Sequence, residues 1–249
     1  MRMDILATYN IKGGVGKTAS AVNLAFEAAR DGGRVLLWDL DPQGAASFYF
    51  RIKPRVKGGS KKLIAGKKDL GDSIKGTDFD NLDLMPADFS YRNLDLLLDD
   101  LKKPTRALRK LLKPIEKDYD YVILDCPPGI TLLSESIMLA ADALIIPLIP
   151  TTLSLRTFEQ LEDFCKKHKI RKTAILPFFS MVDRRKSLHK EILESLPRTH
   201  NEILKGAIPN ASVVERMGLE RQPVGAFAPR SAAARAYRAL WTEIKGRLG

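Results

Sequence analysis

The stretch "YNIKGGVGKTAS", residues 9–20, decides the fold because a glycine-rich turn in it joins an apolar segment to a helical pattern. Its glycines let successive backbone N–H groups point at phosphate oxygens, and the following helix adds its positive N-terminal end. Lys17 then neutralises the phosphates, and the hydroxyl of Thr18 can coordinate Mg²⁺. The stretch predicts a phosphate-binding loop, although Ile11 holds the place of the first glycine in the strict pattern.

The composition favours a polyanionic partner. The 249 residues include 41 Lys and Arg against 30 Asp and Glu, a formal net charge of +11. Such an excess indicates nucleic acid, an acidic membrane surface, or only a soluble basic protein. The sequence has no apolar run of membrane-spanning length, no cleavable signal and only two cysteines without metal-ligand spacing. We expect a cytoplasmic protein without a zinc site or disulfide framework.

Apolar runs that alternate with helical patterns predict the fold class. Unbroken apolar strands separated by helices indicate an α/β, doubly wound, mostly parallel sheet with helices on both faces. We expect one domain over residues 1–249, and a mobile surface excursion at residues 51–68, which hold eight basic residues and no acid. Strands are predicted within residues 4–9, 34–41, 81–86, 121–128, 143–150, 172–183 and 202–209.

Four polar segments follow predicted strands. Besides the phosphate loop they are "DLDPQG" (39–44), "DCPPG" (125–129) and "SMVDRR" (180–185). Ligands of doubly wound sheets bind beyond the carboxyl ends of the strands, so these segments should converge on one crevice. A carboxylate at the end of a buried strand is costly unless it meets a cation or a water molecule that it orients.

The motif "KGGVGKT", residues 12–18, resembles the deviant Walker A motif of the ParA/MinD family of ATPases. "VLLWDLDPQGAAS" is similar to the family's DxDPQG segment, and "YVILDCPPG" to its Walker B segment. The resemblance covers nearly the whole chain. It implies a P-loop fold, ATP and Mg²⁺ as cofactors, and hydrolysis of ATP to ADP and phosphate.

The resemblance also implies roles for single residues. Lys12 reaches across an ATP-sandwich homodimer to phosphates held by the other subunit, whereas Lys17 acts within its own loop. Asp41 positions or activates the attacking water, and Thr18, Asp39 and Asp125 form the magnesium shell. The loop residues placed against the nucleotide are Gly13, Gly14, Val15, Gly16, Lys17, Thr18 and Ala19.

The late segment "ILKGAIPNASVVERMGLERQPV", residues 203–224, resembles the family's Ile-Pro segment, which flanks the adenine. Adenine contacts are therefore carried onto this segment and onto "SMVDRR". The residues are Ile208, Pro209, Asn210, Met181 and Asp183.

The sequence departs from the common pattern of the ParA branch at two places. Ala19 replaces a hydroxyl residue beside the α-phosphate, and Val213 stands where many ParA proteins carry a DNA-binding arginine. DNA contacts therefore rest on basic clusters. One comprises Lys166, Lys167, Lys169, Arg171 and Lys172, and another adds Lys186 to Arg184 and Arg185. The arginines predicted to contact DNA are Arg184, Arg185, Arg216, Arg221, Arg235 and Arg238.

Two features favour the ParA branch over MinD. The first is "DPQG" after the second aspartate. The second is the last segment, residues 231–249, whose apolar side chains share about a 100° arc, as in a helix packed on its own core. They are Tyr237, Leu240, Trp241, Ile244 and Leu248.

The functional expectation is a nucleoid-associated ATPase. Its ATP dimer binds DNA without sequence preference, and a cargo adaptor stimulates hydrolysis, so that DNA or a protein assembly is segregated or spaced. Two alternatives stay open: a MinD-like ATPase on a membrane surface, and a P-loop metabolic enzyme that uses ATP to activate a small substrate.

Overall fold

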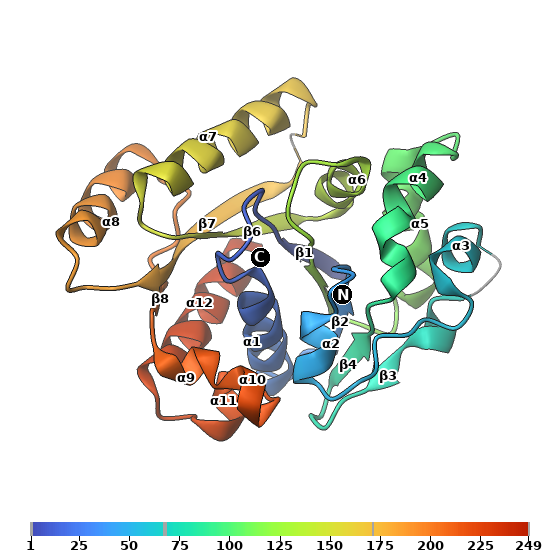
Figure 1. Cartoon of the computed structure of the whole chain (residues 1–249), viewed down its shortest axis with the longest axis horizontal. Coiled ribbons are helices and arrows are strands. Elements are labelled where there is room, and N and C mark those ends of the chain that lie inside the picture. The colour runs from blue at the N-terminus through green and yellow to red at the C-terminus, as the bar shows by residue number, and fades with distance from the viewer. Residues whose placement is uncertain (1, 67–68, 171, 249) are drawn as a thin grey trace.

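The computed structural model describes residues 2–66, 69–170 and 172–248. In this part of the chain, eight strands form one sheet in the order β3-β4-β2-β5-β1-β6-β7-β8 (Figure 1). All neighbouring strands are parallel except β3, which runs antiparallel to β4. The strands are β1 Asp4–Thr8, β2 Val35–Asp39, β3 Lys75–Gly76, β4 Leu82–Met85, β5 Tyr121–Asp125, β6 Ala143–Leu148, β7 Ala174–Val182 and β8 Ala207–Pro209. The predicted α/β, doubly wound class is confirmed.

Helices cover both faces of the sheet (Figure 1). The helices are α1 Lys17–Arg30, α2 Ala45–Tyr49, α3 Gly59–Ile64, α4 Leu94–Asp99, α5 Ala107–Leu112, α6 Leu132–Ala140, α7 Thr152–Lys167, α8 Ser187–Thr199, α9 Ser212–Glu215, α10 Met217–Glu220, α11 Val224–Phe227 and α12 Ala232–Leu248. Single 3₁₀ turns lie at Gly71–Ser73, Phe89–Asn93, Pro104–Arg106 and Lys113–Ile115.

The alternation of side chains along β2 divides the core in two. Leu36 and Trp38 belong to a cluster with apolar residues of α4 to α7, whereas Val35 and Leu37 belong to a cluster with residues of α1 and α12. All five residues of β2 are buried, as expected for a strand covered on both faces. The register sets Asp39 at the end of β2 opposite Asp125 at the end of β5.

The strand predicted over residues 202–209 is wrong for its first half. Only β8 is a strand, and the N–H groups of Lys205 and Gly206 donate instead to the Glu243 carboxylate of α12, at 2.8 and 3.0 Å. A side chain thus satisfies the donors that a longer strand would have paired. The two-residue strand β3 was not predicted, because its sequence has no apolar pattern.

The segment at residues 51–68 packs against the core in its described part, which the prediction of a surface excursion missed; its mobility stays a prediction. It contains α3, and Val56 and Leu63 are buried in the core. The N–H of Val56 donates to the Asp88 carboxylate at 2.7 Å, which anchors the entry to α3. The basic residues of its described part are exposed, whereas two apolar side chains point inward. Two apolar positions are too few to predict a helix from the sequence. Lys67 and Lys68 lie outside the described residues.

Candidate active site

The phosphate loop joins β1 to α1 and requires glycine at two positions. Gly14 and Gly16 have φ angles of 73° and 93°, in the left-handed region that disfavours side chains. A Cβ on Gly16 would also lie 2.9 Å from the Ser180 hydroxyl. Among the described residues, no side chain caps α1, so the N–H groups of its first turn are free to bind an anion.

Lys17 is held inside its own loop. Its side chain is buried, and Nζ donates to the carbonyl oxygen of Lys12 at 3.0 Å. Burial lowers the pKa of Lys17, while the negative charges of Asp125, Cys126 and Asp41 act in the opposite direction. The Lys12 ammonium has neither an ion pair nor a hydrogen bond within the described parts of the chain, so the two lysines differ in their surroundings.

Two carboxylates lie fully buried beneath the loop. Asp39 Oδ2 accepts hydrogen bonds from the Ser47 N–H at 2.8 Å and the Ser47 hydroxyl at 2.7 Å. Asp39 Oδ1 and both oxygens of Asp125 have no hydrogen-bond partner in the described structure. Burial raises the pKa of Asp39 to about 6, and burial beside Asp39 raises the pKa of Asp125 well above its usual range. Carboxylates in this position fit a bound cation.

Magnesium fits this donor set only with ligands from outside the protein. Within the described residues, no group of three or more His, Cys, Asp or Glu could hold a metal by itself. Mg²⁺ is usually bound by one or two carboxylates together with water and substrate phosphates. Thr18, Asp39 and Asp125 would hold the ion that a bound nucleotide brings, and the ion would neutralise phosphate charge.

A cavity of about 440 Å³ opens above these groups, a size suited to a nucleotide. The phosphate loop, α2, the end of β7 and the segment from β8 to α9 line it. Asp41 lies on its wall, where Oδ1 accepts from the N–H of Gln43 at 2.9 Å. The predicted residues that line the cavity are Gly13, Gly14, Gly16, Lys17, Thr18, Ala19, Asp41, Met181, Ile208, Pro209 and Asn210.

Other predicted residues lie off the cavity wall. Val15 is buried in the core, and Asp39 and Asp125 lie beneath the surface at the strand ends. Asp183 faces its own loop, because its carboxylate accepts from Arg185 Nε and a terminal guanidinium nitrogen, both at 2.9 Å. Asp183 does not line the cavity, whereas Met181, two residues earlier, does, and the adenine contact of Asp183 stays a prediction.

Sequence reasoning missed several cavity residues. Tyr49 ends the short helix α2 that follows the "DPQG" segment, and Ser180 is the first residue of the "SMVDRR" segment. Their positions next to these motifs were the only sequence signal that could have indicated that they line the cavity. Tyr237 was assigned to the core face of the last helix; it is buried and also reaches the cavity wall. The remaining ones are Ala45, Pro128, Ala211, Val214 and Glu215.

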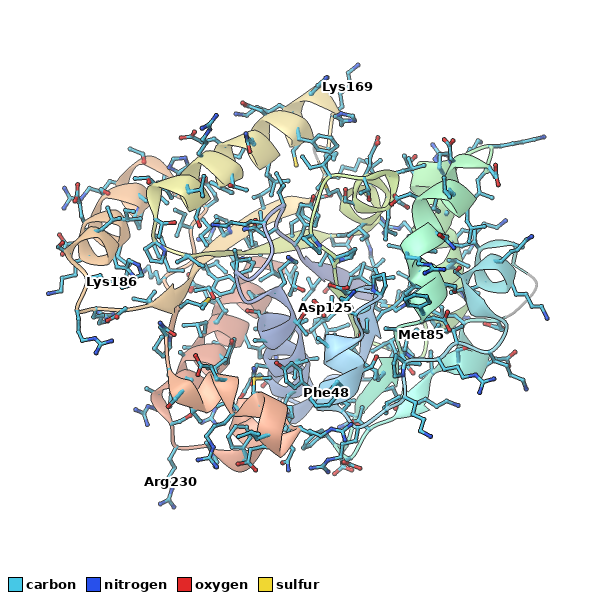
Figure 2. All side chains as sticks on the ribbon, viewed as in Figure 1. Phe48, Met85, Asp125, Lys169, Lys186 and Arg230 are labelled. Carbon is cyan, nitrogen blue, oxygen red and sulfur yellow. The ribbon has the colours of Figure 1, made fainter. Side chains whose placement is uncertain are left out.

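Most of the six arginines predicted for DNA contact have local partners. Arg185 pairs with Asp183 at 2.9 Å, Arg216 with Glu220 at 2.6 Å and Arg238 with buried Glu27 at 3.7 Å. Arg221 stacks on Phe48, 4.5 Å from the ring centre, and donates to its carbonyl oxygen (Phe48 is labelled in Figure 2). In the described residues, Arg184 and Arg235 have no acidic partner. Arg171, in the predicted basic cluster at residues 166–172, lies outside the described residues.

Comparison with known proteins identifies the class. Residues 3–177 match a family described as an AAA domain. The chain is 32% identical to the sporulation initiation inhibitor protein Soj of Bacillus subtilis, over 96% of this chain and 97% of Soj. It is 31% identical to the chromosome partitioning protein ParA of Caulobacter vibrioides, over 98% and 95%.

A solved structure agrees with the fold. Cobyrinic acid a,c-diamide synthase from Mycobacterium smegmatis, with a bound ATP analogue and magnesium, superposes with a TM-score of 0.83 at 25% identity. The match covers 98% of this chain and 94% of the synthase. No helix in the described residues is both long and apolar enough to cross a membrane.

The fold and the loop define a P-loop nucleotide hydrolase. Within that class, the family match and the full-length relatives show that the chain belongs to the ParA/MinD family of ATPases.

The buried carboxylates generate a stability prediction. Asp125→Asn should raise the free energy of unfolding of the nucleotide-free protein by roughly 1 kcal/mol, because it removes an uncompensated buried charge. The same change should abolish the rise in melting temperature on adding ATP with Mg²⁺. Calorimetry with and without nucleotide measures both. A variant that is less stable without nucleotide, and still stabilised by ATP with Mg²⁺, would show that Asp125 is a structural residue.

Proposed function

We propose that this ATPase, a single domain that works in the cytoplasm on the nucleoid, is a partitioning or positioning ATPase. ATP with Mg²⁺ closes a homodimer, the dimer binds DNA without sequence preference, and a cargo adaptor stimulates hydrolysis and release. The observation that carries the proposal is the different surroundings of the two loop lysines. Lys17 is committed to its own loop, whereas the Lys12 ammonium has no partner among the described residues and is free to meet phosphates of a second copy.

The nucleotide assignment follows from the cavity. Gly13 to Ala19 and Lys17 Nζ would hold the phosphates, and Ile208, Pro209, Asn210 and Met181 would hold the base at the other end. Phosphoryl transfer to water needs mainly positioning and charge stabilisation. Asp41, on the cavity wall and half-buried, would orient the water. Lys12 and Lys17 would stabilise the charge on the transferred group.

The DNA assignment rests on net charge and on the relatives. Soj and ParA, named for sporulation control and chromosome partitioning, are about as long as this chain. Arg184 and Arg235 are the candidates best able to contact phosphates, because the described structure gives them no acidic partner. Arg185, Arg216, Arg221 and Arg238 would first have to leave local contacts.

The alternatives are weaker. The apolar side chains of α12 that a MinD-like membrane helix would need are buried in the core, as in Tyr237, Leu240, Trp241 and Ile244. The similarity to a cobyrinic acid synthase keeps the metabolic-enzyme alternative open. Phosphate release that responds to a small acid substrate, and not to DNA with an adaptor, would favour it.

The loop lysines give the first test. Lys17→Ala should lose nucleotide binding, while Lys12→Ala should keep ATP binding and lose the ATP-dependent dimer, because only Lys17 acts within its own loop. Calorimetric ATP titration and light scattering measure the two effects, with Lys117→Ala as a surface control. A normal ATP dimer in Lys12→Ala would refute the role across the dimer.

Asp41 gives a second test. Asp41→Ala should bind ATP and dimerise but hydrolyse roughly 100-fold more slowly, since it loses only the group that orients water. A long-lived ATP dimer on gel filtration is the expected sign. If the variant cannot bind ATP, Asp41 is a ligand of the nucleotide or metal, and the water role is wrong.

DNA binding should depend on nucleotide and on salt. The ATP dimer should bind unrelated duplexes with similar affinity and the ADP form weakly. If about four phosphates are neutralised, raising salt from about 50 to 200 mM should weaken binding roughly 100-fold.

Arginine substitution should reduce that salt dependence. Arg184→Gln with Arg235→Gln should flatten the slope, and the control pair Lys113→Gln with Lys117→Gln should not. Equal binding by the ADP form, or strong preference for one sequence, would count against the mechanism.

A further inference from the structure

A second and larger hollow lies away from the nucleotide cavity. It has a volume of about 870 Å³, and α3, the loop after α4, the Pro104–Arg106 turn and α5 line it. Among the residues that the structure describes, it shares no lining residue with the nucleotide cavity. In Figure 1 these elements lie at the β3–β4 side of the sheet, opposite α7 and α8. We call this hollow the α3–α5 groove.

The rim of the α3–α5 groove is basic. Four exposed cations stand around it: Lys102, Lys103, Arg106 and Lys110. None has an ion pair or side-chain hydrogen bond within the described residues. Asp69 is the one acid among the described lining residues. By contrast, nearby Arg109 on the same helix pairs with Asp142, at 3.7 Å.

The floor of the groove is aliphatic. Leu70 is buried, and Ile64, Leu101 and Leu111 are half-buried between the rim cations. The described lining contains no aromatic side chain, so the groove offers no platform for stacked bases. A nucleic acid would use only the rim, whereas a ligand that carries both carboxylates and apolar side chains matches rim and floor together.

We propose that the α3–α5 groove docks an acidic amphipathic helical segment of a partner protein. Leucine-type side chains of the segment would lie on Ile64, Leu101 and Leu111, as in other helix-in-groove complexes. Its carboxylates would pair with the rim cations. Charge complementarity selects this occupant, because four unpaired cations above an aliphatic floor repel a basic segment and leave a neutral one without ionic partners. The proposal stands independently of the nucleotide and DNA assignments.

The experiment measures binding of a designed probe to the full chain. The probe is a fluorescein-labelled helical peptide of Glu, Ala and Leu, with leucines at i, i+3, i+4 and i+7 on one face. Two matched peptides carry Gln in place of Glu, or Ser in place of Leu. Fluorescence anisotropy should show binding of the first peptide only, and binding should weaken as salt rises.

Matched protein variants locate the site. Lys103→Glu with Arg106→Glu should weaken probe binding roughly tenfold or more, because two attractive pairs become repulsive. Lys113→Glu with Lys117→Glu has the same charge change outside the groove and should leave binding within about twofold. Leu101→Ser should weaken probe binding by removing an apolar contact on the floor of the groove, while the rim charges stay unchanged. The melting temperature and basal ATPase rate show whether each variant is folded. Neither should change in the charge-reversal pairs, whereas Leu101→Ser should keep its ATPase rate and melt at a lower temperature, because Leu101 also packs against the core.

Four results would overturn the proposal. Equal loss in both charge-reversal pairs, or equal binding of the Ser peptide, would mean diffuse attraction to a basic protein. Duplex DNA that displaces the probe and needs Lys103 and Arg106 would make the groove a nucleic-acid site. Sedimentation with phosphatidylglycerol vesicles that needs the same two residues, without probe binding, would make it a lipid site.

Discussion

The burial of Asp39 and Asp125 side by side is the constraint on which the site depends. The parallel register of β2 and β5 fixes the two carboxylates at adjacent strand ends, and neither has exposed surface. Only Asp39 Oδ2 is satisfied by the protein, through Ser47 at the start of α2. Desolvation of two neighbouring acids raises both pKa values, so the charged pair is unfavourable unless a cation joins it. Lys17 is one nearby positive charge that acts on Asp125, and a magnesium ion brought by a bound nucleotide would supply further positive charge.

Hydrogen bonds connect the two ends of the nucleotide cavity, the segment that follows β8 and the helix α2. Arg221, just after α10, donates to the carbonyl oxygen of Phe48 on α2 at 3.1 Å, and Arg51 donates to the carbonyl oxygen of Glu220 at 3.1 Å. From α1, Asn23 accepts from the N–H of Val224 at 2.8 Å. The segment that follows the proposed base contacts is therefore bonded to the helix that follows Asp41. A shift at either end of the cavity must strain these bonds or move the other end.

Much of this arrangement could be predicted from the sequence, because a motif that directly follows a parallel strand must lie at the carboxyl edge of the sheet. Apolar runs gave the central strands, and parallel topology then placed "DLDPQG", "DCPPG" and the phosphate loop at one edge. Side-chain direction could not be predicted in the same way. Met181 reaches the cavity while Asp183 turns back to Arg185, and this depends on the left-handed backbone of Met181, with φ 54°. Tyr237 is buried in the core and also lines the cavity. The position of a residue on the apolar face of a helix does not tell which of the two it contacts.

A net charge of +11 does not by itself say where an anionic partner binds, because many of the basic side chains already form ion pairs within the protein. Arg34 forms a bidentate pair with Asp120, and Lys245 pairs with Asp31 at 2.7 Å. Paired cations contribute little field toward a partner, since each carries its own counter-charge. Lys169 and Lys186, at the outer ends of the α7 and α8 layer, and Arg230 at the opposite side point outward (Figure 2). The rim of the α3–α5 groove differs from these scattered charges because its unpaired cations surround apolar surface. A rim of that kind discriminates among anionic partners by shape as well as by charge, whereas scattered cations attract polyanions in general.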